Sequence, residues 1–234
     1  MREITRKNYT KNRELFILGE CIGKKVLHLG CCDSPDTEFK FDKKVSLFQR
    51  IEKVCEAQQG LDIDKKEIKR LHDMGYKNVS FFDLNKPGKV DFDPEIIIFS
   101  DTLEHLMNLG VALSSLRQLM NEKTVLIVTV PNATMLSRVI GNFLGVIKEH
   151  EDHKVSFTYS ALKQLLMSNK LTINNIFLSG EINIQRLYPE RTERISYKLM
   201  RGVFNIIYKP LINIFPLFSE CLIMTCSLDM KHKT

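Results

Sequence analysis

Short, continuous apolar runs alternate with amphipathic stretches along most of the chain. Runs of about four to eight residues bounded by glycine, proline or acidic residues are typical of strands that are buried on both faces. Helical stretches of about 10–15 residues between such runs indicate βαβ units. The pattern therefore predicts an α/β fold with a doubly wound, mostly parallel seven-stranded sheet and helices on both faces. The predicted strands are 25–30, 57–64, 77–84, 94–101, 123–131, 171–180 and 221–228.

The amphipathic stretches predict the helices between these strands. Asp64 and Gly75 frame one of them as N-cap and terminator. Another is expected to bury Val45, Phe48 and Ile51 on one side. The predicted helices are 11–22, 43–54, 64–75, 109–121, 132–146 and 158–168.

Composition narrows the class of protein. The chain of 234 residues is 44% hydrophobic and 26% charged, as expected for one soluble α/β domain. Its net charge of +6 is too mild for a dedicated nucleic-acid binder, so we expect no nucleic-acid partner. The six cysteines contain no C-x-x-C pair and predict reduced thiols in the cytoplasm. We expect neither a signal peptide nor a membrane-spanning helix.

Acidic residues follow four of the five predicted strands between 25 and 131. Ligands of open parallel sheets bind beyond the carboxyl ends of the strands. A single aspartate there is often only the N-cap of the next helix, but several together suit the hydroxyls of a ribose. They suit a pyrophosphate badly, because carboxylates repel phosphate and the first loop is poor in glycine. The acidic residues are Asp33, Asp62, Asp64, Asp83 and Asp101, and the first loop also contains Gly30, Cys31, Cys32 and Ser34.

Five stretches at strand ends carry a family resemblance. They are "VLHLGCCDS", "GLDIDKKEIKRLHDMGYKNVSFFDL", "EIIIFSDTLEHLMN", "VLIVTVPN" and "DHKVSFTYSALKQLL". Their order and spacing over residues 24–180 resemble the class I S-adenosylmethionine-dependent methyltransferases of the small-molecule type, which have a Rossmann-like fold.

The resemblance implies S-adenosyl-L-methionine as the cofactor. Asp62 would bind the ribose, and Asp83 would approach the adenine. Glu52 lies nearer the spacing of a dinucleotide fingerprint but falls inside a predicted helix. The implied cofactor-binding residues are His28, Gly30, Cys31, Cys32, Asp62, Ile63, Asp83, Leu84, Ser100, Asp101 and His105.

The first loop departs from the family pattern. His28 stands where an acidic residue is common, and Cys32 and Ser34 stand where the family has its second and third glycines. Small side chains still permit close approach of the backbone, though less freely than glycine. Residues 34–42 are interpreted as an extra loop that would cover the methionine end of the cofactor.

Methyl transfer to an alcohol requires a group that removes the proton, and histidine is the usual one near neutral pH. His153 matches a histidine of the family and is the first candidate for a general base or a substrate contact. His150 and Asp101 are the other candidate catalytic residues. His150, Asp152, His153 and Asp101 carry the oxygen and nitrogen donors of a metal site, but their spacing is not diagnostic, and we expect no metal.

The chain is interpreted as a single methyltransferase domain over 1–234. Its parts are an N-terminal helix (1–23), the cofactor-binding core (24–180), a helical insertion or lid (186–218) and the last strand (219–230). Within the insertion, residues 191–218 combine a basic and an apolar stripe. They predict either a lid helix or a contact with an anionic membrane surface, which would make the protein peripheral to the inner face of the membrane.

The expected activity is methyl transfer to a hydroxyl oxygen of a small polar acceptor. A sugar or glycolipid in envelope polysaccharide biosynthesis is the expected class, by analogy alone. The alternatives are N-methylation of a small amine, or a catalytically inactive relative that binds the cofactor and serves as a partner protein. The sequence leaves the oligomeric state open.

Overall fold

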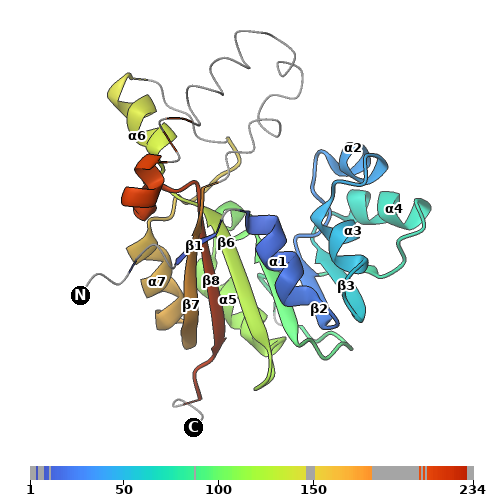
Figure 1. Cartoon of the computed structure of the whole chain (residues 1–234). Helices are drawn as coiled ribbons and strands as arrows, with labels where there is room; N and C mark the ends of the chain where they lie inside the picture. Colours follow the sequence, from blue (N-terminus) through green and yellow to red (C-terminus); the bar gives the residue numbers. More distant parts are fainter. Residues whose placement is uncertain are drawn as a thin grey trace.

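The fold is an open sheet between two layers of helices (Figure 1). The computed structural model describes residues 4, 8–10, 12–86, 88–145, 151–180, 206, 208 and 210–230. The strands are β1 (Tyr9–Thr10), β2 (Lys25–Leu29), β3 (Ala57–Asp62), β4 (Val79–Phe81), β5 (Ile96–Ser100), β6 (Val125–Pro131), β7 (Leu171–Ser179) and β8 (Cys221–Leu228).

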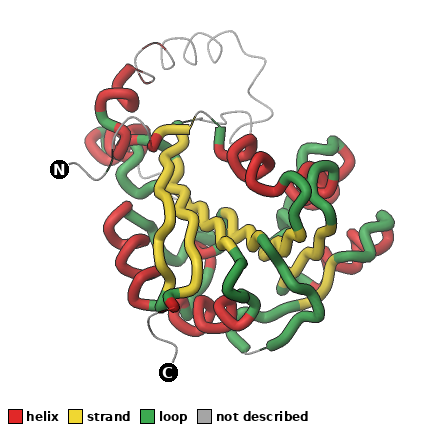
Figure 2. The backbone as a smooth tube through the Cα atoms, turned by 60° about the horizontal axis from the view of Figure 1, so that its bottom comes forward, coloured by secondary structure: helices red, strands yellow, loops and turns green. Residues whose placement is uncertain are grey.

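The helices fill the connections between the strands. They are α1 (Arg13–Cys21), α2 (Thr37–Asp42), α3 (Leu47–Glu52), α4 (Lys65–Asp73), α5 (Leu109–Gln118), α6 (Leu136–Phe143) and α7 (Tyr159–Ser168), with the 3-10 turns η2 (Leu103–His105) and η4 (Pro216–Phe218). Figure 2 shows the strands in the middle of the molecule with helices on either side. In the described part of the chain, no helix has both the length and the apolar character needed to span a bilayer.

The sheet is mostly parallel, as predicted. Its order is β1-β7-β8-β6-β5-β2-β3-β4, and only β8 runs antiparallel to its neighbours. All seven predicted strands are present, and the two-residue β1 adds an eighth at the edge beside β7, which the sequence analysis missed. So short a strand leaves no periodic pattern to detect.

Alternate residues of the central strands face two separate cores. On β5, Ile97 and Phe99 pack in the core that includes α5 and α7. Ile96 and Ile98 pack on the opposite face in the core that includes α1. Both sets are buried, which explains why the strands read as continuous apolar runs.

The connection between β2 and β3 differs from the prediction. The expected helix 43–54 begins only at Leu47, because Lys44 adopts a left-handed conformation (φ 57°) and Ser46 has extended backbone. Val45 is therefore exposed instead of buried. The expected loop 34–42 contains the helix α2.

Two other boundaries differ as well. The third predicted strand shortens to Val79–Phe81, and the helix predicted over 132–146 forms only at Leu136–Phe143.

Asp64 is confirmed as the N-cap of α4, since its side chain accepts hydrogen bonds from the backbone N–H groups of Lys66 and Glu67. The predicted insertion 186–218 lies largely outside the described residues.

Candidate functional site

The turn after β2 is fixed by the packing of its glycine. Gly30 has φ 70°, and its N–H donates to the carbonyl of Leu61 (2.8 Å). A Cβ at this position would lie 2.4 Å from Oγ1 of Thr102, which follows β5. Glycine is thus required here both by the backbone conformation and by the neighbouring strand end.

The two cysteines that follow point into the core. Cys31 and Cys32 are buried in a cluster with Phe41 and Phe48. Gly60 on β3 makes room for them, because a Cβ there would lie 2.6 Å from the sulfur of Cys31. Both side chains, including that of Cys32 at a glycine position of the family, are therefore accommodated below the turn. The predicted contact of these two residues with a cofactor would have to pass through their backbone.

Asp62 is held beside this turn by backbone groups. Its Oδ2 accepts a hydrogen bond from the N–H of Cys32 (2.9 Å), and its Oδ1 accepts one from the N–H of Asp64 (3.0 Å). Ile63, next in the chain, leaves 58% of its side chain exposed. Asp62 is therefore not a helix cap, because Asp64 has that role.

Asp83 lies in the turn after β4. Its Oδ1 accepts hydrogen bonds from both the backbone N–H (2.9 Å) and the side-chain amide of Asn85 (3.0 Å). These bonds, the backbone one foremost, hold the pKa of Asp83 below its usual value. Leu84 beside it is almost buried. The turn stabilises an ionised carboxylate, and its contact with adenine stays a prediction.

His28 lies in the core below the turn. Its ring stacks on Phe48 with centroids 6.0 Å apart, and burial lowers its pKa to about 4. Among the described residues, none forms a hydrogen bond with its Nδ1. The imidazole is thus neutral near pH 7. Its predicted contact with the cofactor would have to pass through the backbone of β2.

Asp33 fixes the start of the loop that follows. This residue has φ 57°, and its carboxylate is paired with Lys40 of α2 and accepts a hydrogen bond from Ser46 (2.9 Å). The expected covering loop is therefore a short folded unit anchored at Asp33. Its predicted position over the methionine end of a cofactor stays a prediction.

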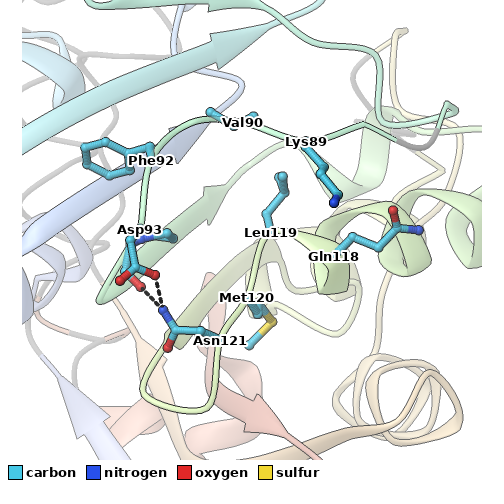
Figure 3. A pocket seen from close by; sticks show the side chains of 9 residues that line it. Lys89, Val90, Phe92, Asp93, Gln118, Leu119, Met120 and Asn121 are labelled. Atoms are coloured by element: carbon cyan, nitrogen blue, oxygen red, sulfur yellow. Dashed lines mark hydrogen bonds between the residues drawn. The ribbon is translucent and has the colours of Figure 1, made fainter.

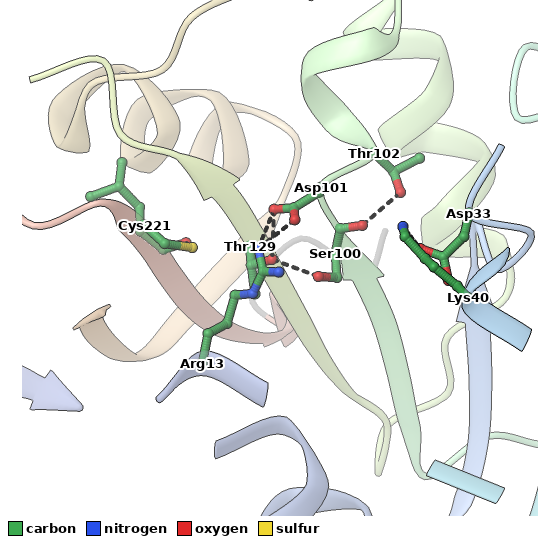
Figure 4. Close-up of polar contacts among 9 residues, drawn as sticks. Arg13, Asp33, Lys40, Ser100, Asp101, Thr102, Thr129 and Cys221 are labelled. Carbon is green, nitrogen blue, oxygen red and sulfur yellow. Dashed lines mark hydrogen bonds and ion pairs between the residues drawn. The ribbon is translucent and has the colours of Figure 1, made fainter. Parts of the chain in front are cut away.

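The end of β5 carries an ion pair that the sequence analysis missed. Asp101 (φ 47°) is paired with Arg13 from α1, and Thr129 lies beside them on β6 (Figure 4). Ser100 shares a hydrogen bond with Thr129 (2.8 Å). Burial alone would lower the pKa of Arg13, but the charges of Asp101 and Cys221 and the hydrogen bonds with them together outweigh burial, and the pKa is raised. No local signal links Arg13 to Asp101, 88 residues away.

Two histidines meet beyond this ion pair. The rings of His105 and His153 lie edge to face with centroids 4.9 Å apart. The backbone N–H of Lys154 donates to the carbonyl of Glu104 (2.8 Å), which holds the segment of His153 against η2. The buried Glu104 belongs to this group, although the sequence analysis did not select it. His150 lies outside the described residues.

These residues divide into two groups along the carboxyl edge of the sheet, which we name by the roles that the resemblance predicts for them. The group after β2 and β3, called the cofactor side below, comprises Gly30, Cys32, Asp62 and Ile63. The group after β5, called the acceptor side below, comprises Asp101, Glu104 and His105 together with Arg13 and His153, which lie against them.

A pocket of about 240 Å³ lies at the amino-terminal edge of the sheet, opposite to these two groups. Figure 3 shows the side chains that line it. It lies between the segment before β5, including Phe92 and Asp93, and the residues after α5, including Asn121. The amide of Asn121 donates to Asp93 across its rim (2.5 Å). Ligands of this class of sheet bind at the opposite edge, so this pocket is not the candidate site.

Comparison with known proteins identifies the fold. No protein-family model and no curated protein matches the sequence. An S-adenosylmethionine-dependent methyltransferase from Mesorhizobium loti is similar with TM-score 0.52 and 12% identity, covering 92% of this chain and 95% of that chain. A SAM-dependent methyltransferase from Archaeoglobus fulgidus is similar with TM-score 0.52 and 20% identity, covering 92% and 95%.

A third similar structure contains a bound ligand. Magnesium protoporphyrin IX methyltransferase from Synechocystis PCC 6803, solved with bound SAH, has TM-score 0.53 and 14% identity and covers 92% of this chain and 78% of that chain. Together these structures show that the chain has the fold of the class I S-adenosylmethionine-dependent methyltransferases. The fold predicted by the resemblance is confirmed.

Proposed function

We propose that this chain, which has the fold of the S-adenosylmethionine-dependent methyltransferases, transfers a methyl group to a hydroxyl oxygen of a small polar acceptor. When bound, S-adenosylmethionine supplies the electrophilic methyl group. The observation that carries the proposal is Asp62, a carboxylate held by two backbone N–H groups beside the Gly30 turn.

The cofactor side fits the chemistry of a nucleoside. Each carboxylate oxygen of Asp62 accepts one backbone hydrogen bond, and a carboxylate has about four acceptor sites, so it retains capacity for ribose hydroxyls. The exposed Ile63 offers an apolar surface beside Asp62 for a flat base. The neutral His28 beneath brings no positive charge that would favour a phosphate.

The acceptor side supplies alignment and proton removal. An acceptor between the ends of β5 and β6 would face Asp101, whose charge is balanced by Arg13. His153 is positioned by the backbone contact between Lys154 and Glu104, and we assign it the uptake of the acceptor proton. Holding the acceptor oxygen in line is the main contribution that a protein makes to such a displacement.

Exposed apolar side chains near α6 support a glycolipid among the polar acceptors. Phe143 at the end of α6 is 92% exposed, and Phe215 and Leu217 are also exposed. A hydrogen bond from Thr134 to the carbonyl of Leu217 (3.1 Å) joins the start of this region to the C-terminal segment. Such side chains favour contact with a lipid tail or a membrane surface. The basic stripe predicted for this contact lies outside the described residues.

Binding of S-adenosylhomocysteine, measured by calorimetry, is the first test. Asp62→Ala should weaken binding about tenfold to a hundredfold, because a charged hydrogen-bond acceptor is worth roughly 1.5–3 kcal/mol. Asp64→Ala is the matched control: it removes the N-cap of α4 at a cost of about 1 kcal/mol in stability and leaves affinity almost unchanged. Equal affinities for the two variants would overturn the cofactor site.

A screen with methyl-labelled cofactor tests the acceptor class. Sugar nucleotides, glycolipids and small amines would be offered in parallel, and label should enter the hydroxyl acceptors. Transfer only to amines would replace the proposal by N-methylation. Tight binding of S-adenosylhomocysteine with no transfer to any of these acceptors would favour a cofactor-binding partner protein.

A further inference from the structure

We propose that Glu104, His105 and His153 together bind a divalent transition-metal ion of the Zn²⁺ type, and that its open coordination position takes the acceptor hydroxyl. The ion-binding part stands on the geometry alone. The catalytic part rests on the proposed function, and it makes His153 a metal ligand instead of the proton-accepting group.

The three donors already lie close together. One ligand atom from each of Glu104, His105 and His153 lies within 4.8 Å of the other two. A tetrahedral ion with bonds of about 2.0–2.2 Å spaces its ligand atoms about 3.4 Å apart. The ligand atoms must therefore approach one another by about 1–1.5 Å. Rotation of the side chains of the exposed His105 and the half-buried His153 moves their ring nitrogens by this amount.

Backbone contacts preorganise this geometry. The carbonyl of Glu104 accepts hydrogen bonds from the N–H groups of Lys154 (2.8 Å) and Val155 (3.2 Å). The segment that carries His153 is therefore fixed on the turn that carries His105. Residues separated by about 50 positions are held as one cluster, which a metal site needs before the ion arrives.

The donor set selects the kind of ion. Two imidazoles and one carboxylate form the His₂Glu set of open catalytic zinc sites, with three protein ligands and one position left for water or substrate. Imidazole donors favour Zn²⁺, Co²⁺ or Ni²⁺ over Mg²⁺, which prefers oxygen ligands alone. Asp101 is engaged by Arg13, which keeps the set at three.

The burial of Glu104 and the exposure of His105 both suit a bound cation that is open to solvent. Glu104 is 2% exposed, and a buried carboxylate is stabilised by a neighbouring positive charge. His105 is exposed, so the fourth position faces solvent and an arriving acceptor. Thr102, which packs against Gly30, lies three residues before His105, and the ion would thus sit next to the cofactor side.

A second cluster of similar dimensions does not fit an ion as well. Cys31, Cys32 and Asp62 also bring three ligand atoms within 4.8 Å of one another. Both thiols are buried, and hydrogen bonding with Cys31 together with burial raises the pKa of Cys32. A thiol that resists ionisation is a poor ligand, and Asp62 is already held by backbone N–H groups.

The ion would ionise the acceptor. A bound divalent cation lowers the pKa of a coordinated water to about 7, and the pKa of a coordinated alcohol is lowered in the same way. The O–H bond breaks, its electron pair stays on the oxygen as metal-bound alkoxide, and the proton passes to solvent. The acceptor oxygen is thereby activated without a protein base.

The test is a metal titration of untagged protein stripped with EDTA and desalted. Co²⁺ should bind with one ion per chain and give the visible absorption of a four- or five-coordinate site, and Zn²⁺ should displace it. Mg²⁺ at millimolar concentration should not. His105→Ala, His153→Ala and Glu104→Gln should each weaken Co²⁺ binding more than the roughly tenfold to hundredfold cost of losing an outer-shell partner.

Two variants keep the result interpretable. Asp152→Asn changes an exposed acid next to His153 and should leave the Co²⁺ spectrum and affinity unchanged; loss of binding there would overturn the assigned ligand set. His72→Gln, on α4, controls for metal binding by a distant histidine. Circular dichroism checks that each variant is folded.

Other outcomes overturn the inference directly. They are no Co²⁺ binding by the parent, equal affinity in the parent and the His153→Ala variant, or displacement by Mg²⁺. Failure of the proposed function is distinguishable, since it would abolish binding of S-adenosylhomocysteine while one Co²⁺ per chain still bound.

Discussion

The cofactor side and the acceptor side of the carboxyl edge are built differently. On the cofactor side, backbone N–H groups hold a single carboxylate above an apolar floor that contains the neutral His28. On the acceptor side, an ion pair and a cluster of titratable groups come from distant parts of the chain. The first arrangement suits recognition of a neutral sugar and base, and the second suits movement of charge. Variants should therefore separate binding from turnover.

The largest effect is expected on the acceptor side. His153→Ala should reduce the turnover of the labelled-cofactor assay by about 10²- to 10⁴-fold, the usual contribution of a proton-transferring or acceptor-activating group. The affinity for S-adenosylhomocysteine, measured by calorimetry, should change less than about twofold, because His153 lies outside the cofactor side. Full turnover in this variant would remove His153 from the reaction.

The next effect concerns the floor of the cofactor side. Burial lowers the pKa of His28 to about 4, from an ordinary value near 6.5. Between these two pH values the unfolded chain therefore binds a proton at His28 and the folded chain does not. The free energy of unfolding is unaffected by His28 above pH 6.5 and decreases by about 3 kcal/mol as the pH falls to 4.

Urea unfolding at a series of pH values checks this. His28→Leu lacks the group, so its stability should fall less between pH 6.5 and 4 than that of the parent. Above pH 7 the two pH profiles should run parallel. Parallel profiles over the whole range would show that His28 is not buried as a neutral ring.

The third prediction addresses the turn of the cofactor side. Gly30→Ala forces a side chain into the left-handed conformation and toward Thr102, at a cost of about 1–3 kcal/mol. We expect a lower midpoint of thermal unfolding and an affinity for S-adenosylhomocysteine reduced about tenfold or more. Gly19→Ala in α1 is the control, because a Cβ there meets nothing within 4 Å, and it should raise stability slightly.

The smallest effect is expected from the ion pair of the acceptor side. Arg13→Met removes the positive charge that faces the partly buried Asp101 and should cost about 1–2 kcal/mol, between the values of exposed and buried pairs. Asp101→Asn in the same background should recover part of the loss, because the negative charge that Arg13 balances is then gone. Additive costs in urea unfolding of the single and double variants would show that the pair contributes nothing.

The sequence predicted the cofactor side more fully than the acceptor side. Gly30, Asp62 and Ile63 each stand directly at a strand end, so the apolar pattern that located the strands also located them. The direction of Cys31 and Cys32 was not predictable, because it depends on the space that Gly60 leaves on the next strand. The split between α2 and α3 depends on Lys44, whose left-handed backbone has no signature in its side chain.

On the acceptor side, only part of the group was identified. Asp101, His105 and His153 were selected as candidates, but Arg13 and Glu104 were not. In the sequence alone, Arg13 is one of several charged residues of a predicted helix, and Glu104 is one polar residue after a predicted strand. Their importance arises from contacts between α1, η2 and the segment before α7.

By itself, the sequence determined the strands, their mostly parallel arrangement and the row of acids at their ends. Burial of the strands on both faces requires continuous apolar runs, and these runs can be recognised in the sequence without the structure. Only the tertiary structure decided which charges meet. The pairing of Arg13 with Asp101 and the joining of Glu104, His105 and His153 depend on how distant segments pack. That packing is set by the shape of the whole core, which no short stretch of sequence encodes.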